Sequence, residues 1–187
     1  FDDTSGLLYL GDQNSRKIFE IDPDTDTVLR EMSLPENIRD LGIDDERELL
    51  YVGQQNRNWV VVSIADESFG EIVRGPFPFI ESNRSIDVDP ERGFVYGAVP
   101  SRGVEVLNAE TGESIGVVNG TAGAYYVAAD EVNGRVGVAH FNDVPDVTNV
   151  EVFSAASGFS RLWAIPTRAN PRQLDFDSTN GLVYVGY

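Results

Sequence analysis

Hydrophobic and polar residues alternate along the chain in short runs, which clusters of Gly, Asp, Asn and Pro separate. The segment 84–120 shows the pattern well, with alternating runs at 86–89, 94–99, 104–107 and 113–118. Runs of this length that are rich in Val, Ile, Tyr and Phe are typical of β-strands. No stretch has a sustained helical period. The pattern therefore predicts an all-β chain in which four antiparallel strands make one unit.

The same unit recurs along the chain. Related sequences begin at residues 1, 43, 88, 129 and 176, which lie 42, 45, 41 and 47 residues apart. Such a period marks one supersecondary unit copied in tandem, and four-stranded meanders of roughly 40–45 residues have the size of a β-propeller blade. We expect a single β-propeller domain over 1–187 with about four repeats. The repeats span approximately 1–38, 39–83, 84–124, 125–171 and, incomplete, 172–187.

The turn after the innermost strand of each unit has Asp early and Gly late. Asp can hydrogen-bond the turn backbone, and Gly supplies the positive φ that closes a bulged hairpin. This favours turn formation over metal binding for the Asp series. The second copy has Glu48 where the others have Gly, so we expect a different turn there. The pairs are Asp2 and Gly6, Asp89 and Gly93, Asp130 and Gly134, and Asp177 and Gly181.

Two short motifs resemble those of a known repeat family. They are LYVG at 50–53 and IDPDTDTV at 21–28, with VLNAETG at 106–112 as a variant of the second. They resemble YVTN-type β-propeller repeats, in the broad superfamily that also holds NHL-like and lactonase-like propellers, which are mostly seven-bladed. The resemblance covers essentially the whole chain and implies architecture more than function. The Asn of the Tyr-Val-x-Asn signature is missing, since Asp12, Gln54 and Val99 stand near its place.

The repeat also predicts a partial ring. The chain opens at the end of an innermost strand and stops within a second strand, which leaves three complete blades and two partial ones. Propellers close with about 4–8 blades. The chain is then either a piece of a larger ring or a small ring in which the terminal pieces form a composite blade. An open arc exposes strand edges and apolar faces, so we expect partners: other protein chains or the missing blades.

The acidic composition narrows the choice of partners. The net charge is −17, from 31 Asp and Glu against 14 Lys and Arg, and Lys17 is the one Lys. Such a surface repels nucleic acid and anionic lipid. It is typical of proteins that work in high salt, but also of acidic exported proteins from GC-rich genomes, and both interpretations stay open. Without Cys there is no disulfide and no thiolate metal site, and no run is apolar enough to span a bilayer.

Ligand sites of propellers usually lie at the mouth of the central channel. Arg39, Arg84 and Arg172 occupy equivalent positions just before or within the innermost strands, and Tyr125 takes that place in the remaining copy. If the ring closes, these guanidinium groups converge and can bind a carboxylate or phosphate. The alternative is a structural role, in which each Arg pairs with an acid of a neighbouring blade, such as Asp40, Asp87 or Asp175.

Other polar residues are candidates for metal binding or glycosylation. The loop 141–149 contains carboxylate and amide oxygens that suit Ca²⁺ or another divalent cation. These residues are Asn142, Asp143, Asp146 and Asn149. Glycosylation sequons begin at Asn83 and Asn119. His140 is the one His, but no nucleophile motif accompanies it, so no catalytic residue is assigned. Trp59 begins a third strand, where an exposed indole would be a contact residue.

These features favour a non-enzymatic propeller that is secreted or lies on the cell surface, with the periplasm as a further compartment. It would act as a binding or assembly module, with a high-salt organism as one setting. The family that it resembles includes archaeal surface-layer propellers, so this part of the reasoning is analogy. The alternative is a lactonase-like, metal-assisted hydrolase whose site lies at the channel mouth. A haem-dependent redox propeller is disfavoured, because the chain has no Cys and a single His.

Overall fold

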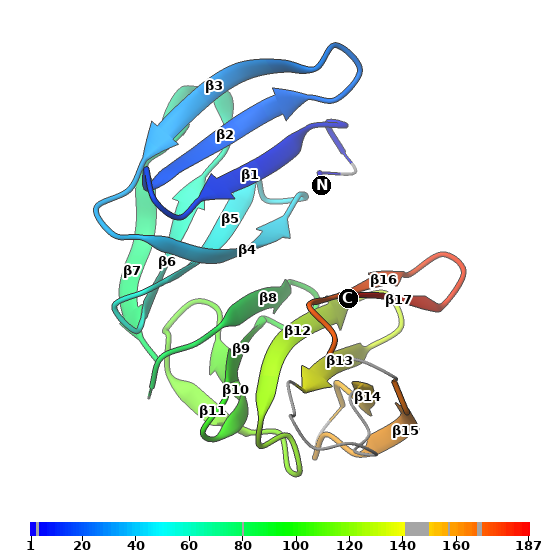
Figure 1. The fold of residues 1–187 in the computed structure, drawn as a ribbon. Coiled ribbons are helices and arrows are strands. Elements are labelled where there is room, and N and C mark those ends of the chain that lie inside the picture. The colour runs from blue at the N-terminus through cyan, green and yellow to red at the C-terminus, as the bar shows by residue number, and fades with distance from the viewer. Residues whose placement is uncertain (3, 80, 141–149, 157, 168–169) are drawn as a thin grey trace. The chain divides into compact units, whose positions relative to one another are not determined.

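The computed structural model describes residues 1–187 except 3, 80, 141–149, 157 and 168–169. The described chain consists of antiparallel strands and one 3-10 turn, Asp66–Ser68. It divides into two compact units, Phe1–Ser82 and Asn83–Tyr187, whose strands are labelled in Figure 1. Among these residues, no helix has the length and hydrophobicity that a membrane crossing requires.

The first unit contains two antiparallel sheets in which strands follow one another in chain order. Three strands make the first sheet: β1 (Leu8–Asp12), β2 (Lys17–Asp22) and β3 (Thr27–Ser33). Four make the second: β4 (Ile38–Asp44), β5 (Leu49–Gln54), β6 (Asn58–Ser63) and β7 (Ile72–Pro78).

The second unit contains three such sheets. The first has β8 (Ser85–Asp89), β9 (Phe94–Val99), β10 (Gly103–Asn108) and β11 (Ser114–Val117). The next has β12 (Ala124–Asp130), β13 (Arg135–His140), β14 (Val150–Ser154) and β15 (Arg161–Ile165). A two-stranded sheet follows, made of β16 (Gln173–Asp177) and β17 (Leu182–Gly186).

These strands confirm the predicted repeat. The runs predicted at 86–89, 94–99, 104–107 and 113–118 correspond to β8, β9, β10 and β11, with ends that differ by at most one residue. Four-stranded antiparallel meanders in tandem, with each strand paired to the next along the chain, make the fold all-β and propeller-like.

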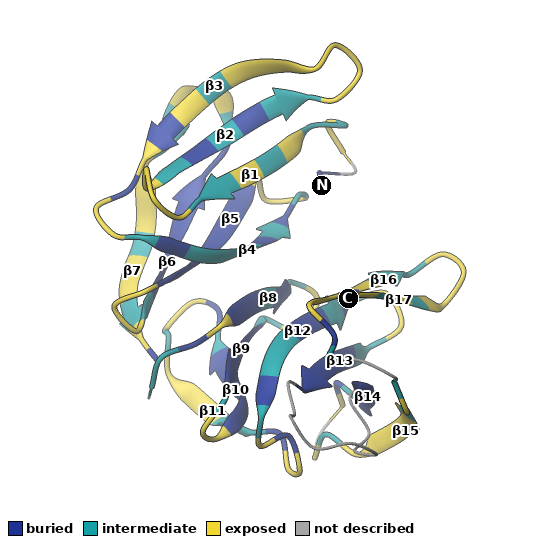
Figure 2. Ribbon diagram, in the orientation of Figure 1, coloured by how far each residue is buried: buried dark blue, intermediate teal, exposed yellow. Residues whose placement is uncertain are grey.

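The sheets of each unit pack face to face through apolar side chains, which appear as dark blue segments of the central strands in Figure 2. In the second unit, Tyr96 and Val106 of one sheet belong to the same buried cluster as Val127 and Val138 of the next. Each fully buried Val or Leu stabilises the fold by about 1.5–3 kcal/mol. This packing between sheets, rather than any single sheet, forms the core.

Successive sheets approach so closely that glycine is required at particular points. A Cβ built on Gly137 of β13 would lie 2.7 Å from Leu174 Cδ2 and 3.0 Å from two ring carbons of Phe176. Real Cβ atoms do not come this close to a packed neighbour, so a larger residue would push β16 away. Gly11 of β1 faces Ile38 in the same manner, at 2.9 Å from its Cγ2 atom.

The Asp at the end of each innermost strand caps its hairpin, which confirms the predicted turn role. One carboxylate oxygen accepts a hydrogen bond from the backbone N–H three residues ahead, at distances between 3.0 and 3.1 Å. Such Asx-type bonds satisfy the turn backbone locally. The five capping residues are Asp2, Asp44, Asp89, Asp130 and Asp177.

The expectation of a different turn at Glu48 is wrong. Its φ is +54°, close to the +61° to +74° of Gly6, Gly93, Gly134 and Gly181 at the corresponding places. Glu48 therefore adopts the same left-handed conformation as the glycines. For a residue with a Cβ, this conformation costs about 1–2 kcal/mol. Packing of the surrounding strands holds the turn in its repeat geometry despite that cost.

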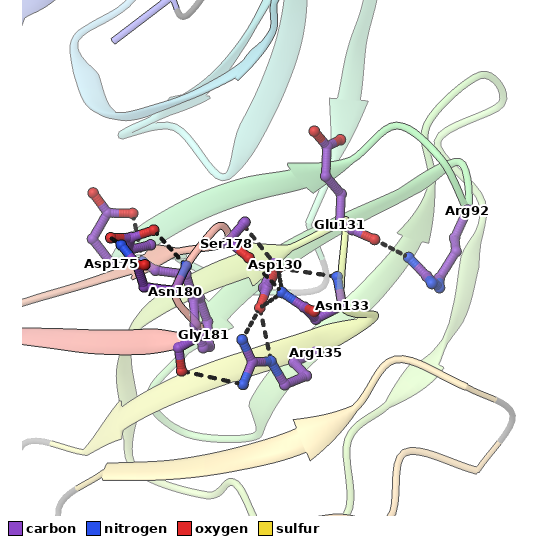
Figure 3. Close-up of polar contacts among 11 residues, drawn as sticks. Arg92, Asp130, Glu131, Asn133, Arg135, Asp175, Ser178, Asn180 and Gly181 are labelled. Atoms are coloured by element: carbon purple, nitrogen blue, oxygen red, sulfur yellow. Dashed lines mark hydrogen bonds and ion pairs between the residues drawn. The ribbon is translucent and has the colours of Figure 1, made fainter.

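Asp130 joins its own hairpin to the next one (Figure 3). It accepts hydrogen bonds from Ser178 Oγ at 2.8 Å, from Asn133 Nδ2 at 3.1 Å, and from Arg135 Nε at 2.7 Å and Nη2. Asn133 Nδ2 also donates to the Ser178 carbonyl at 2.9 Å, and Arg135 Nη1 to the Gly181 carbonyl at 3.5 Å. The buried carboxylate thus fixes the distance between two successive sheets.

Asp89 and Asp130 occupy equivalent turns, but their pKa values shift in opposite directions because they accept different numbers of hydrogen bonds. Burial raises the pKa of Asp89, because its bonds with Arg92 do not compensate for lost hydration. Burial acts in the same direction on Asp130, but the bonds from Arg135, Ser178 and Asn133 outweigh it and lower the pKa of Asp130. The opposite shifts imply opposite contributions to stability as the pH changes.

We predict that Asp130→Asn lowers the free energy of unfolding at pH 7 by about 1–3 kcal/mol, since charge-assisted hydrogen bonds are lost. The lowered pKa means that this carboxylate stabilises the fold above its unfolded-state pKa of about 3.9, and that the contribution disappears as the pH falls through the folded-state pKa. The substitution should therefore make unfolding less sensitive to acid, as measured by urea denaturation at neutral and acidic pH.

Asp89→Asn serves as the matched control. Because the pKa of Asp89 is raised, its charged form is disfavoured in the fold, and its contribution declines as the pH rises from the unfolded-state value to the folded-state value. Asp89→Asn should cost less at pH 7 than Asp130→Asn. Equal losses for the two variants at both pH values would contradict this account.

Candidate functional site

Each complete sheet has two ends that differ in composition. The Asp-capped hairpins form one, which we call the turn end. The loop before the innermost strand and the loop between the second and third strands form the other, which we call the loop end. All three arginines of the predicted anion site, Arg39, Arg84 and Arg172, belong to the loop end.

Arg84 lies directly before β8 and is exposed. Its backbone N–H donates to the Ala98 carbonyl at 2.7 Å, which sets the position of the residue, and its guanidinium lies 5.6 Å from the centre of the Tyr125 ring. Tyr125 sits at a bulge of β12, between the paired residues Ala124 and Tyr126. A cation over an aromatic ring at this distance is attracted to it, so Tyr125 helps to orient the guanidinium group.

Arg172 repeats the placement of Arg84 before β16. Its backbone N–H donates to the Gly186 carbonyl at 2.7 Å, and its side chain is exposed. The second unit therefore brings Arg84, Tyr125 and Arg172 to equivalent positions of three successive sheets, as the sequence predicted for these places. This row has the composition expected of an anion site, with the Arg84 guanidinium group beside a tyrosine and a second arginine at the equivalent place of the next sheet.

Arg39 belongs to the first unit and lies in β4, at a bulge between Ile38 and Asp40. Its Nε atom is buried and has no hydrogen-bond partner among the described residues. A guanidinium nitrogen without a partner is costly to bury, and an anion would satisfy it. Convergence of Arg39 with Arg84 and Arg172 on one site stays a prediction.

Two of the three acids named in the structural alternative, Asp87 and Asp175, accept hydrogen bonds from backbone groups. Asp87 accepts hydrogen bonds from the N–H of Val88 at 2.9 Å and of Ala129 at 2.7 Å, and Asp175 from that of Phe176 at 2.8 Å. Within the part of the chain that the structure describes, Arg39 and Arg84 form no ion pair. Anion binding and a structural role for these arginines both stay predictions.

Ion pairing divides the arginines by location. At the turn end and along the outer strands, arginine pairs with a carboxylate, as in Arg47–Asp44, Arg92–Asp89, Arg135–Asp130, Arg30–Glu20 and Arg161–Glu151. At the loop end, five arginines have no ion pair among the described residues: Arg16, Arg39, Arg57, Arg84 and Arg102. In a chain of net charge −17, positive charge is thus left uncompensated mainly at this end.

His140 is buried in a polar cluster. Its Nε2 atom lies 3.1 Å from Glu151 Oε2 and its Nδ1 atom 3.3 Å from the Ala122 carbonyl, while Arg161 donates to Glu151 Oε1 at 2.7 Å. Both ring nitrogens face acceptors, so neither is directed at a substrate. The sequence indicated a hydrogen-bonding role for His140 but did not identify the partner. The pairing of β13 with β14 is what brings Glu151 beside His140.

The predicted metal residues Asn142, Asp143, Asp146 and Asn149 lie outside the described residues. Among the described residues, no group of three or more His, Asp or Glu side chains is placed to hold a metal ion. Asp22, in the motif at 21–28, caps a turn: its carboxylate accepts hydrogen bonds from Thr25 Oγ1 and from the Asp24 N–H. The bond from the Thr25 hydroxyl, with those from the turn backbone, lowers the pKa of Asp22.

The two sequons differ in accessibility. Asn83 is fully buried in the described structure, which disfavours a glycan there, and its modification stays a prediction. Asn119 is exposed and stays a prediction, although the hydroxyl of Thr121 is buried and bonds to Val104 and Val118.

The expectation that Trp59 is an exposed contact residue is wrong. Its side chain is fully buried, with ring centres 6.0 Å from Tyr51 and 4.7 Å from Phe77. Its position at the start of a strand suggested exposure, but the packing of β6 against its neighbours covers the indole.

Comparison with known proteins identifies the fold and no family. No protein-family model and no curated protein matches the sequence. Among many solved structures that resemble the chain is Kuenenia stuttgartiensis hydrazine synthase, with a TM-score of 0.68 and 16% identity over 90% of this chain. This chain spans about half, 49%, of that one. At such low identity the likeness supports a propeller-like fold alone, and membership of the YVTN or NHL families stays an expectation.

We predict that Arg84→Ala abolishes the stabilisation that a multivalent anion such as citrate gives to the protein. The reason is that Arg84 has no carboxylate partner of its own and lies beside Tyr125 at the exposed loop end. An anion at a hundred times its Kd raises the free energy of unfolding by about 2.7 kcal/mol, which thermal denaturation with and without citrate detects.

Arg102→Ala is the control for this prediction, because Arg102 is also exposed at the loop end but lies outside the row of Arg84, Tyr125 and Arg172. It should retain most of the citrate effect. If Arg84→Ala lowers stability equally with and without citrate, Arg84 is structural. If both variants lose the citrate effect equally, citrate stabilises the protein through the overall positive charge of the loop end and not through this row.

Proposed function

We propose that this chain is a non-enzymatic propeller module, secreted or located at the cell surface, that acts by binding and assembly. One observation carries the proposal: two sheet faces are exposed at positions whose counterparts in the other repeats are buried. Single exposed apolar residues are normal, but a contiguous apolar sheet face is typical of an interaction surface.

The first such face belongs to β16 and β17. Tyr184 is 56% exposed, whereas its counterparts Tyr51 and Tyr96 are 2% and 0% exposed. The correspondence follows from strand register, since Tyr184 pairs with Asp175 as Tyr96 pairs with Asp87. Leu182, on the same face, is exposed as well. This surface is ready to receive another sheet.

Asp175 supports the same interpretation. Asp87, its counterpart, uses one carboxylate oxygen for its own backbone and the other for the N–H of Ala129, on the innermost strand of the next sheet. Asp175 makes the first of these bonds, to Phe176 at 2.8 Å, and is exposed. Its second oxygen is suited to accept a main-chain N–H from a strand that docks on β16.

The second face belongs to β1. Leu10 is 53% exposed, and its counterparts Val52 and Val138 are fully buried. Leu8, two residues earlier and on the same side of the strand, is exposed too. The partner that suits both faces is another antiparallel sheet with an apolar surface, supplied by another chain or by further blades of the same ring.

The distribution of charge supports a location in a salty, extracellular setting. Many carboxylates at exposed turns form no ion pair with another described residue, as at Asp24, Glu91 and Glu110. Their mutual repulsion destabilises a compact chain in dilute buffer and is screened by salt. The unpaired arginines of the loop end fit a binding role, with a carboxylate or phosphate group as ligand.

The test of assembly is sedimentation equilibrium over a range of protein concentrations. The chain should self-associate, and Tyr184→Asp should weaken the apparent Kd by roughly tenfold or more, since an unpaired charge would be buried in the contact. Val132→Asp is the matched control, because Val132 is 70% exposed at the turn end. A chain that stays monomeric, or equal effects of both substitutions, would contradict the proposal.

The salt response is a separate prediction. If the acidic surface is an adaptation to salt, the melting temperature should rise between dilute buffer and molar KCl. A gain of about 2 kcal/mol corresponds to roughly 4–8 °C for a domain of this size. Sucrose, a neutral cosolute, controls for stabilisation that does not involve charge. A melting temperature that does not change with KCl would contradict the hypothesis of salt adaptation, but it would not bear on the assembly proposal.

A further inference from the structure

The first unit has an open cavity of about 330 Å³ at its loop end, lined by Arg16, Glu36, Asn37, Gln55 and Asn56. Three segments supply these residues: the loop between β1 and β2, the connection from β3 to β4, and the loop between β5 and β6. Its volume is at the lower end of the range of about 300–1,000 Å³ that is usual for small-molecule sites. This volume suits a small ligand that contains a single ring.

Hydrogen bonds between the three segments hold the walls of the cavity in place. Arg16 Nη1 donates to the Pro35 carbonyl at 2.9 Å, and the Leu34 N–H donates to the Arg16 carbonyl at 2.8 Å. Across the cavity, the Gln55 N–H donates to the Asn37 carbonyl and Asn37 Nδ2 to Gln55 Oε1, both at 2.9 Å. The polar groups are therefore positioned before a ligand arrives, which limits the entropy lost on binding.

Several polar groups of the walls stay available in the described structure. The donors are the remaining N–H groups of Arg16, together with Gln55 Nε2 and Asn56 Nδ2. The Asn56 amide is oriented by its own oxygen, since Asn56 Oδ1 accepts a hydrogen bond from the Asn58 N–H. The acceptors are the Glu36 carboxylate and Asn37 Oδ1. Donors and acceptors are thus mixed, and the lining carries one positive and one negative side chain.

We propose that this cavity binds a neutral polyhydroxylated ligand of one sugar ring. A hydroxyl group both donates and accepts, so neighbouring hydroxyls can satisfy the guanidinium of Arg16 and the carboxylate of Glu36 together. A simple anion would meet Glu36, and a simple cation would meet Arg16. No aromatic side chain lines the cavity, so recognition rests on hydrogen bonds. This site is independent of the arginine row in the second unit and of the assembly faces.

The test follows the side-chain NH₂ signals of Asn37, Gln55 and Asn56 in ¹H–¹⁵N correlation spectra during titration with methyl α-D-glucopyranoside. A small ligand in an open polar site should bind with a Kd on the order of millimolar, so these signals should shift and saturate. Glu36→Ala removes an acceptor that bonds to nothing else in the described chain, and should weaken binding roughly tenfold. Glu110→Ala, at an exposed turn of the second unit, is the matched control and should bind as the unaltered chain does.

Three outcomes would overturn the inference. Shifts that stay linear with concentration would mean that no site exists. Equal titrations for Glu36→Ala and the unaltered chain would place the ligand elsewhere. Saturable shifts with glycine or acetate, and none with the glucoside, would assign the cavity to a zwitterion or an anion instead of a polyol. None of these results bears on self-association, so the assembly proposal is tested separately.

Discussion

Burial of one sheet against the next is the constraint on which the rest of the structure depends. A four-stranded sheet of this size has two faces and cannot bury both by itself, so each repeat relies on its neighbours. The close approach at Gly137, where Leu174 and Phe176 leave no room for a Cβ, shows how tightly successive sheets fit. Tyr184 and Leu10, by contrast, are exposed, although the corresponding residues of other repeats belong to the core.

The same constraint distributes the charged residues. At the turn end the innermost strands finish in buried carboxylates, and arginine or backbone N–H groups must compensate for their lost hydration. Asp130 is linked in this way to the following hairpin through Ser178, whereas Asp89 has fewer donors. The arginines of the turn end are therefore committed to structure. Arg84, at the loop end, is exposed and forms no ion pair among the described residues, so its guanidinium group is accessible to a ligand.

We accordingly expect function in this fold to concentrate at the loop end, where backbone connections vary between repeats. Two different chemistries occur there. The second unit presents Arg84 beside Tyr125, a combination that suits an anion. The first unit has a cavity of mixed donors and acceptors around Arg16 and Glu36, which suits a neutral ligand. His140, by contrast, is held by Glu151 and the Ala122 carbonyl, and serves the packing of its own sheet.

The sequence by itself determined the strands, their order and the Asp-capped turns, because alternation, spacing and turn chemistry are local properties. It also determined the equivalence of Arg39, Arg84 and Arg172, since the repeat aligns them. Only the tertiary structure decided exposure and partnership. It buried Trp59 and Asn83, gave Glu48 the conformation of a glycine, and joined His140 to Glu151 and Arg16 to Pro35. These outcomes depend on contacts between residues far apart in the chain, which no local pattern encodes.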